Sequence, residues 1–204
     1  MGRVTVTTAS TKGRPRGFDR DQALEAALME FWQHGYEATS IATLTKAMGI
    51  NPPSLYAAFG DKRKLFTAAV ERYAVTHGDY GARALSEPTA HGVVETMLRL
   101  AATDYTGPDH PPGCLVVDGA TNTTDASRDV AEELRSYREG TKQAIADRIS
   151  EDVAAGALPS TTDAQALATF YAAVIQGMST QARDGASERD LQRVADVALA
   201  AWPD

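Results

Sequence analysis

The chain has 204 residues, a hydrophobic fraction of 43% and a net charge of −7. A chain of this length buries about 70% of its unfolded surface, so it needs no disulfide framework, and its single cysteine excludes an internal one. The negative charge argues against a general nucleic-acid coat protein. No run approaches the ~18 apolar residues of a membrane span, and the N-terminal segment lacks the apolar stretch of a secretory signal, so we expect a cytoplasmic protein with no membrane partner.

Residues 1–17 form the first segment. Residues 11–17 contain Lys12, Arg14 and Arg16 among glycine and proline, with no apolar side chain. This composition predicts a flexible basic arm, and the plain alternative is a disordered tail.

An amphipathic helix is predicted for residues 18–36. Asp19 and Gln22 have the spacing of a capping box at its start, and Gly35 is placed to end it. The apolar positions recur at helical spacing and are Leu24, Ala27, Leu28, Phe31 and Trp32.

Two short helices across a tight turn are predicted for residues 39–59. The first carries apolar residues at helical spacing and leaves its axis at Gly49, where we expect a positive φ. Asn51 is a suitable N-cap for the second, and Pro52 and Pro53 fit its first turn, where a missing N–H costs little. Gly60 ends this helix, and Asp61 is placed to cap the next.

These lengths match a helix-turn-helix, whose second helix enters the DNA major groove by its N-terminal residues. An ordinary pair of packed helices would give a similar pattern. The helix before the motif favours the DNA-binding interpretation, because three helices make a minimal DNA-binding head. Charge agrees, since residues 1–80 hold ten Lys or Arg against eight Asp or Glu, whereas residues 81–204 hold ten against nineteen. Part of the basic charge, in Lys62, Arg63 and Lys64, lies where phosphates are expected, although a charge run is often only a solvated face.

The first 80 residues resemble the tetracycline-repressor (TetR) family. The residues that carry the resemblance, in the family's order and spacing, are Gly35-Tyr36, Thr39-Ser40-Ile41, Gly49-Ile50, Leu55-Tyr56, Phe59, Asp61-Lys62 and Leu65-Phe66. The resemblance implies an all-α homodimer in which a three-helix helix-turn-helix head is joined by a fourth helix to a helical ligand-binding and dimerisation domain. We accordingly expect an arm at 1–17, a DNA-binding domain at 18–62, a linking helix at 63–80 and a ligand-binding and dimerisation domain at 81–204.

The resemblance also implies which residues bind double-stranded operator DNA. Tyr56 would contact the backbone and base methyl groups, Lys62 a phosphate, and Pro52, Pro53 and Ser54 the base edges. Pro52, Ala57 and Ala58 depart from the family's pattern, so direct base contacts are expected to be sparse. The predicted DNA-binding residues are Arg14, Arg16, Thr39, Ser40, Thr43, Pro52, Pro53, Ser54, Tyr56 and Lys62.

Residues 81–204 show helical periodicity and no strand periodicity. Gly78, Gly81, Pro88 and Gly92 predict a loosely structured connection after the linking helix. Helices are predicted at 91–105 and 127–155, with a loop at 107–113 and a short helix or turn at 114–122. The apolar stripe of the long helix comprises Val130, Leu134, Tyr137, Thr141, Ile145, Ile149 and Val153.

By analogy with the family, the middle helices would enclose a pocket for an unknown small-molecule effector. The candidate lining residues are Met97, Tyr105, Leu115, Asp118, Asn122, Tyr137, Tyr171 and Gln176. Methionine and aromatic residues at helical spacing are more often plain core. Cys114 permits an oxidant or electrophile sensor, since a thiolate at a helix N-terminus can be activated, but a small buried thiol is the simpler interpretation.

The last two helices, predicted at 163–183 and 187–202, are apolar around more than one face. A helix buried on one side needs a stripe of only about 100°, so the surplus indicates a second partner. The resemblance implies a four-helix dimer interface, and the alternative is burial within one chain. The expected interface residues are Leu167, Tyr171, Val174, Met178, Leu191, Val194 and Ala198.

Together these features predict a homodimeric transcriptional repressor that a small molecule releases from a palindromic operator. An enzyme is not expected, because the four histidines are scattered and neither a metal-binding motif nor a glycine-rich phosphate loop occurs, so we expect no catalytic residue, metal or cofactor. The competing hypothesis is a helical ligand-binding or adaptor protein that keeps the head without specific operator binding. Sequence-selective, salt-dependent DNA binding separates the two.

Overall fold

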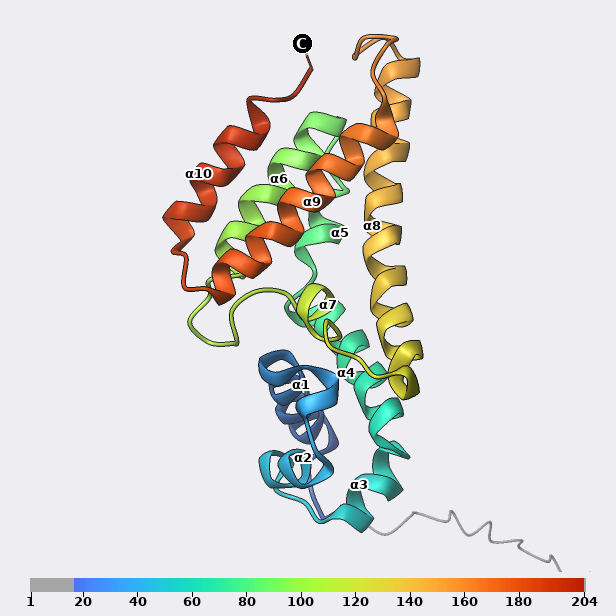
Figure 1. Cartoon of the computed structure of the whole chain (residues 1–204), viewed down its shortest axis with the longest axis vertical. Coiled ribbons are helices and arrows are strands. Elements are labelled where there is room, and N and C mark those ends of the chain that lie inside the picture. Colours follow the sequence, from blue (N-terminus) through green and yellow to red (C-terminus); the bar gives the residue numbers. More distant parts are fainter. Residues whose placement is uncertain (1–16, 204) are drawn as a thin grey trace, which may run out of the picture.

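The computed structural model describes residues 17–203, and this part of the chain is built from helices, turns and loops (Figure 1). The basic arm, with Arg14 and Arg16, lies outside the described residues. The helices are α1 (Arg20–Ala38), α2 (Ile41–Met48), α3 (Pro52–Phe59), α4 (Lys62–Thr76), α5 (Tyr80–Ala84), α6 (Ala90–Asp104), α7 (Leu115–Asp118), the 3₁₀ turn η1 (Asp125–Ser127), α8 (Arg128–Ala154), α9 (Ala164–Arg183) and α10 (Glu188–Leu199). None of these helices is long and apolar enough to cross a membrane.

Helices α1 to α4 form a compact head at one end of the molecule (Figure 1). Its core is aromatic: the Phe31 and Phe66 rings meet edge to face with centroids 5.0 Å apart, and both side chains are fully buried. Leu28, Leu44 and Leu55 fill the remaining space. Each helix begins where the sequence predicts, because Asp19, Ser40, Asn51 and Asp61 all accept hydrogen bonds from first-turn amides.

The predicted loose connection after α4 is wrong in part. Helix α4 ends at Thr76, and residues 80–84 form the short helix α5. Ala84 of α5 is fully buried, and α5 packs against α6. The sequence did not predict this short helix because Gly78 and Gly81 have low helix propensity. Tertiary packing against α6 outweighs that propensity.

The body is an assembly of the longer helices α6, α8, α9 and α10 (Figure 1). Helix α8 packs along α9, and α10 lies against α6 and α9. The predicted stripe of α8 is buried at its two ends, through Val130, Leu134, Ile145 and Ile149, but Tyr137 at its centre is 38% exposed. The centre of α8 therefore does not pack into the core.

The caps of the head can be tested individually. Asn51 Oδ1 accepts the Ser54 N–H at 2.9 Å, so Asn51→Ala should lower the free energy of unfolding by about 1 kcal/mol, measured by urea denaturation. Asn122→Ala is the matched control, since Asn122 is an exposed loop residue. Equal stability of the two variants would contradict the capping role.

Candidate nucleic-acid interface and central cavity

The turn between α2 and α3 fixes the direction of α3. Gly49 takes φ +65°, as the sequence predicts, and its N–H donates to the Lys46 carbonyl at 3.3 Å, which closes α2. Asn51 then caps α3. Since Leu55 and Phe59 are buried, the opposite side and the N-terminal end of α3 are turned to solvent.

That outer surface carries four of the ten predicted DNA-binding residues. Pro52 and Pro53 are exposed, Ser54 is partly exposed, and Tyr56 is 49% exposed although it is aromatic. Beside them lies a shallow hollow lined by Gly17, Phe18, Gly49, Ile50, Asn51, Ser54, Ala57 and Ala58. The structure thus brings the predicted α3 residues onto one solvent-exposed face, where they could reach the base edges of a DNA major groove.

The residues at the start of α2 have different roles from one another. Ser40 is exposed and caps α2 through the Thr43 N–H at 3.0 Å, and the two hydroxyls lie 2.9 Å apart. Thr39, in contrast, is fully buried, and its hydroxyl donates to the Gly35 carbonyl at 2.6 Å. The prediction that Thr39 contacts DNA through its side chain is therefore wrong, because this hydroxyl closes the end of α1.

The basic run at the start of α4 is also divided. Lys62 Nζ lies 4.2 Å from the centre of the Tyr36 ring, and Lys64 points into solvent near Asp61. Arg63 pairs with Asp129 at 2.5 Å and Glu133 at 2.6 Å, both on α8. Arg63 thus ties the head to the body, and its guanidinium is engaged by carboxylates of α8 rather than free for a phosphate.

The head meets the body at α7. Gly35 interrupts α1 with φ +75°, and a side chain there would meet the Gly119 carbonyl oxygen at 3.3 Å. The next residue, Tyr36, donates its N–H to that same oxygen at 2.8 Å. The Glu37 carboxylate accepts both the N–H and the hydroxyl of Thr124, at 3.0 and 2.9 Å. The end of α1 is therefore held by backbone and side-chain bonds to residues 119–124.

A cavity of about 140 Å³ is enclosed by residues of α4, α5, α7, α8 and α9 and by Tyr105 at the end of α6. Of the eight predicted lining residues, Tyr105, Tyr137 and Gln176 line it. The lining residues that the sequence interpretation missed include Tyr73, Tyr80, Arg138, Lys142 and Ile145, together with Cys114, which it had singled out for another reason. On α8 they could have been found, because Arg138, Lys142 and Ile145 follow one another at spacings of four and three on one helix face.

The other five predicted lining residues lie elsewhere. Met97, Leu115 and Tyr171 are fully buried core residues, and the Tyr171 hydroxyl donates to the Ala198 carbonyl at 3.1 Å. Asp118 and Asn122 line a separate hollow at the junction with the head. Their inclusion in the central cavity was wrong, because helical spacing does not distinguish a cavity wall from a packed core.

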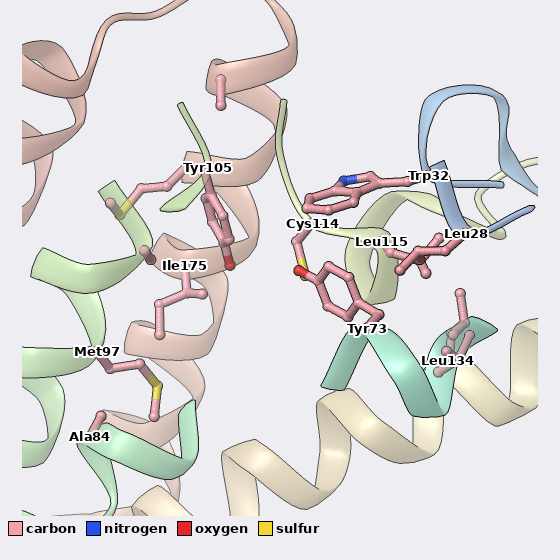
Figure 2. Packing of buried hydrophobic residues seen from close by; sticks show 14 of the residues in the cluster. Leu28, Trp32, Tyr73, Ala84, Met97, Tyr105, Cys114, Leu115, Leu134 and Ile175 are labelled. Atoms are coloured by element: carbon pink, nitrogen blue, oxygen red, sulfur yellow. The ribbon is translucent and has the colours of Figure 1, made fainter. Parts of the chain in front are cut away.

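The Cys114 thiol is buried beside the cavity. Figure 2 shows the Tyr73 hydroxyl beside the Cys114 sulfur, to which it donates at 3.2 Å. Burial raises the pKa of the thiol. This environment disfavours the thiolate, so it supports the simpler interpretation of a buried structural thiol.

An apolar patch covers one face of α9 and α10. Its residues are Phe170, Val174, Arg193, Val194, Val197, Ala198 and Ala201, and Leu167 lies beside it. Three of its apolar side chains are well exposed, namely Phe170, Val194 and Val197. Tyr171, Met178 and Leu191 were also predicted for an interface, but each is buried within the chain, so for them the alternative of internal burial is correct.

Both halves of the chain match known family models. The model for bacterial regulatory proteins of the tetR family matches residues 23–69, and the model for the tetracyclin repressor-like C-terminal domain matches residues 94–198. The chain belongs to the TetR family. The all-helical fold and the helix-turn-helix expected from its sequence are thereby confirmed, and this TetR-family chain is a DNA-binding transcriptional regulator rather than an enzyme.

Several relatives of this TetR-family chain align over nearly its whole length. The HTH-type transcriptional repressor ComR of Escherichia coli K12 is 36% identical over 98% of this chain and 96% of its own. BdcR, a second HTH-type transcriptional repressor of that strain, is 35% identical over 96% and 94%. A cysteine mutant of the TetR family regulator CifR, solved with a 26-bp double-strand operator DNA, is 43% identical, with a TM-score of 0.89 over 94% of this chain and all of that one.

The bond network at the junction predicts a pH dependence. The Thr124 N–H, then the hydroxyls of Ser127 and Thr124, lower the pKa of Glu37 from its ordinary 4.5 to about 2. Because the folded-state pKa is depressed, the ionised carboxylate stabilises the fold above about pH 4.5, and this contribution is lost as the pH falls towards 2. The wild type should therefore melt at a higher temperature than Glu37→Gln near pH 6. The difference between the two melting temperatures should become smaller as the pH is lowered towards 2.

The control for this experiment is Glu71→Gln, which removes an exposed carboxyl of α4 that makes no ion pair within the described residues. Its melting temperature should differ from that of the wild type by less than that of Glu37→Gln does. This difference should not shrink comparably as the pH is lowered. A gap for Glu37→Gln that is independent of pH would show that the carboxylate does not stabilise the junction through its charge.

Proposed function

We propose that this regulator is a homodimeric repressor that binds a roughly palindromic operator and is released when a small molecule occupies the central cavity. The observation that carries the proposal is the open outer face of α3, where Tyr56 and the residues of the first turn are accessible together. The printed names of the relatives support it, since two are repressors and the CifR structure holds operator DNA. A regulator of this kind acts on DNA in the cytoplasm.

Each segment of the chain has a separate role in the proposed function. We assign residues 18–62 to DNA binding, with contacts from Ser40, Thr43, Pro52, Pro53, Ser54, Tyr56 and Lys62, and residues 1–17, with Arg14 and Arg16, to an arm that reaches a neighbouring minor groove. Residues 63–80 link this unit to residues 81–204, which bind the effector and form the dimer. The charge distribution supports this division. Residues 1–80 have more basic than acidic side chains, as contacts with phosphates favour, whereas residues 81–204 have more acidic ones.

The apolar patch of α9 and α10 is the proposed dimer surface. Val197 is 76% exposed and Phe170 is 42% exposed, and a two-fold axis through the patch would pack it against the same patch of a second copy. Two heads on one such dimer would read sites about one DNA turn, ~34 Å, apart.

The proposal as a whole is tested by selecting bound sequences from random duplex DNA at near-physiological salt. Enrichment of a palindrome, with affinity that falls steeply as salt rises, is expected for a repressor. A folded dimer that enriches nothing would overturn the proposal in favour of an adaptor protein.

Tyr56→Ala should weaken binding to the selected operator by about tenfold or more, because it removes an exposed aromatic side chain from the proposed reading face. Binding is measured by fluorescence anisotropy, and the melting temperature should be almost unchanged. Val75→Ala, which truncates a 74% exposed apolar side chain of α4 outside the proposed reading face and the cavity, is the control and should bind the operator like the wild type. Equal affinities of the two variants would remove Tyr56 from the interface.

Val197→Asp should shift the protein from dimer to monomer in sedimentation velocity, because it places a charge in the apolar patch. Val75→Asp is a close control, since Val75 is 74% exposed and lies on α4, away from the patch. A dimer that survives Val197→Asp would contradict the proposed surface.

A further inference from the structure

The central cavity carries an unbalanced positive charge. Arg138 and Lys142 both line it from α8. Lys142 Nζ pairs with Glu139 at 2.5 Å, but Arg138 makes no ion pair within the described residues. Arg138 instead donates from Nη1 to the Val116 carbonyl at 2.6 Å. Partial burial lowers the pKa of this guanidinium, which nevertheless stays charged at neutral pH.

The remaining walls offer little polarity of their own. The Tyr80 and Tyr105 hydroxyls lie 2.6 Å apart and share one hydrogen bond, and the Tyr73 hydroxyl donates to the Cys114 sulfur. Between them the cavity presents ring faces and aliphatic side chains, including Ile145 and Ile175 (Figure 2 shows Tyr105, Tyr73 and Ile175). A ligand in this space would meet mostly apolar surface, the polar side chains of Thr141 and Gln176, and the Arg138 guanidinium, which makes no ion pair within the described residues.

The size of the cavity limits the ligand. Its volume of about 140 Å³ is close to the ~150 Å³ of an engineered apolar cavity that holds benzene. The ligand body is thus about the size of one six-membered ring, with a charged group directed at α8.

We propose that the effector of this site is a small apolar monocarboxylate, whose carboxylate is bound by Arg138. This inference rests on the proposed function, because it names the ligand class for the same cavity. The planar fork of a guanidinium fits a carboxylate with two parallel hydrogen bonds, and these two bonds to an ionised acceptor are stronger than the single bond that Arg138 now donates to a neutral carbonyl.

Binding would also act on the head. When Arg138 turns to a carboxylate, the Val116 carbonyl of α7 loses its donor. Three residues further along the chain, Gly119 accepts the Tyr36 N–H of α1. The ligand therefore competes with the Val116 carbonyl of α7 for Arg138. The end of α7 in turn binds α1 through the Gly119 carbonyl. A ligand shifts a conformational equilibrium only by its differential affinity for the two states, and the exchange of this one bond supplies such a difference.

The test uses the full-length dimer and three matched pairs of probes: benzoate and benzamide, cyclohexanecarboxylate and its amide, and hexanoate and hexanamide. Binding is measured by calorimetry and by melting temperature. We expect at least one acid to bind and its amide to bind at least about tenfold more weakly. If no acid binds, or if an acid and its amide bind equally, the proposal is overturned.

The role of Arg138 is tested by substitution. Arg138→Gln should lose about tenfold or more of the affinity for the acid and with it the preference over the amide. Arg138→Lys keeps the charge and should retain the preference at lower affinity, which also separates the effect from a failure to fold. Arg135→Gln is the control, because Arg135 is one turn away on α8, exposed and paired with Glu132. Equal loss in Arg135→Gln, or none in Arg138→Gln, would overturn the assignment.

Operator release is measured separately on the selected DNA. An acid that binds should dissociate the wild-type complex, and the amide should not. If no operator is ever selected, the proposed function fails, while calorimetry still decides the ligand class. If the operator is bound but the bound acid does not release it, the coupling through Val116 is wrong.

Discussion

The short helix α7 is the support on which the arrangement of the molecule depends. On the body side, the Cys114 N–H donates to Ser179 Oγ at 2.8 Å, and that hydroxyl donates to Asp118 at 2.7 Å. On the head side, Gly119 accepts the Tyr36 N–H. One turn of helix thus has polar bonds in both directions, and because buried polar groups are costly to leave unpaired, α7 cannot shift without affecting both.

The same segment is a wall of the central cavity, since Cys114, Val116 and Val117 line it. Contacts on either side strengthen the junction: Arg63 pairs with α8, and Arg183 of α9 donates to the Trp32 carbonyl at 3.3 Å. The head is therefore attached at several points around α7, and α7 is the element that both lines the cavity and accepts the Tyr36 N–H at its C-terminal end. This geometry gives a small ligand a short physical path to the DNA-binding helices.

The sequence predicted the head well because its signals are local. Caps such as Asn51, the positive φ of Gly49 and the apolar spacing of α1 depend on neighbours within a few residues. The cavity was predicted poorly because it depends on long-range packing: Tyr137 and Tyr171 have the same helical periodicity, yet one lines the cavity and the other is core. Burial of Thr39 and the pairing of Arg63 with α8 likewise come from contacts that no local pattern records.

The most direct test of the central claim is amide hydrogen exchange over residues 33–38 and 115–119 in the wild type and in Arg138→Gln. If α7 carries the state of the cavity to the head, removing the Arg138 to Val116 bond should speed exchange both in residues 115–119 and at Tyr36, across the junction. Faster exchange confined to residues 115–119, with the end of α1 as protected as in the wild type, would contradict the account.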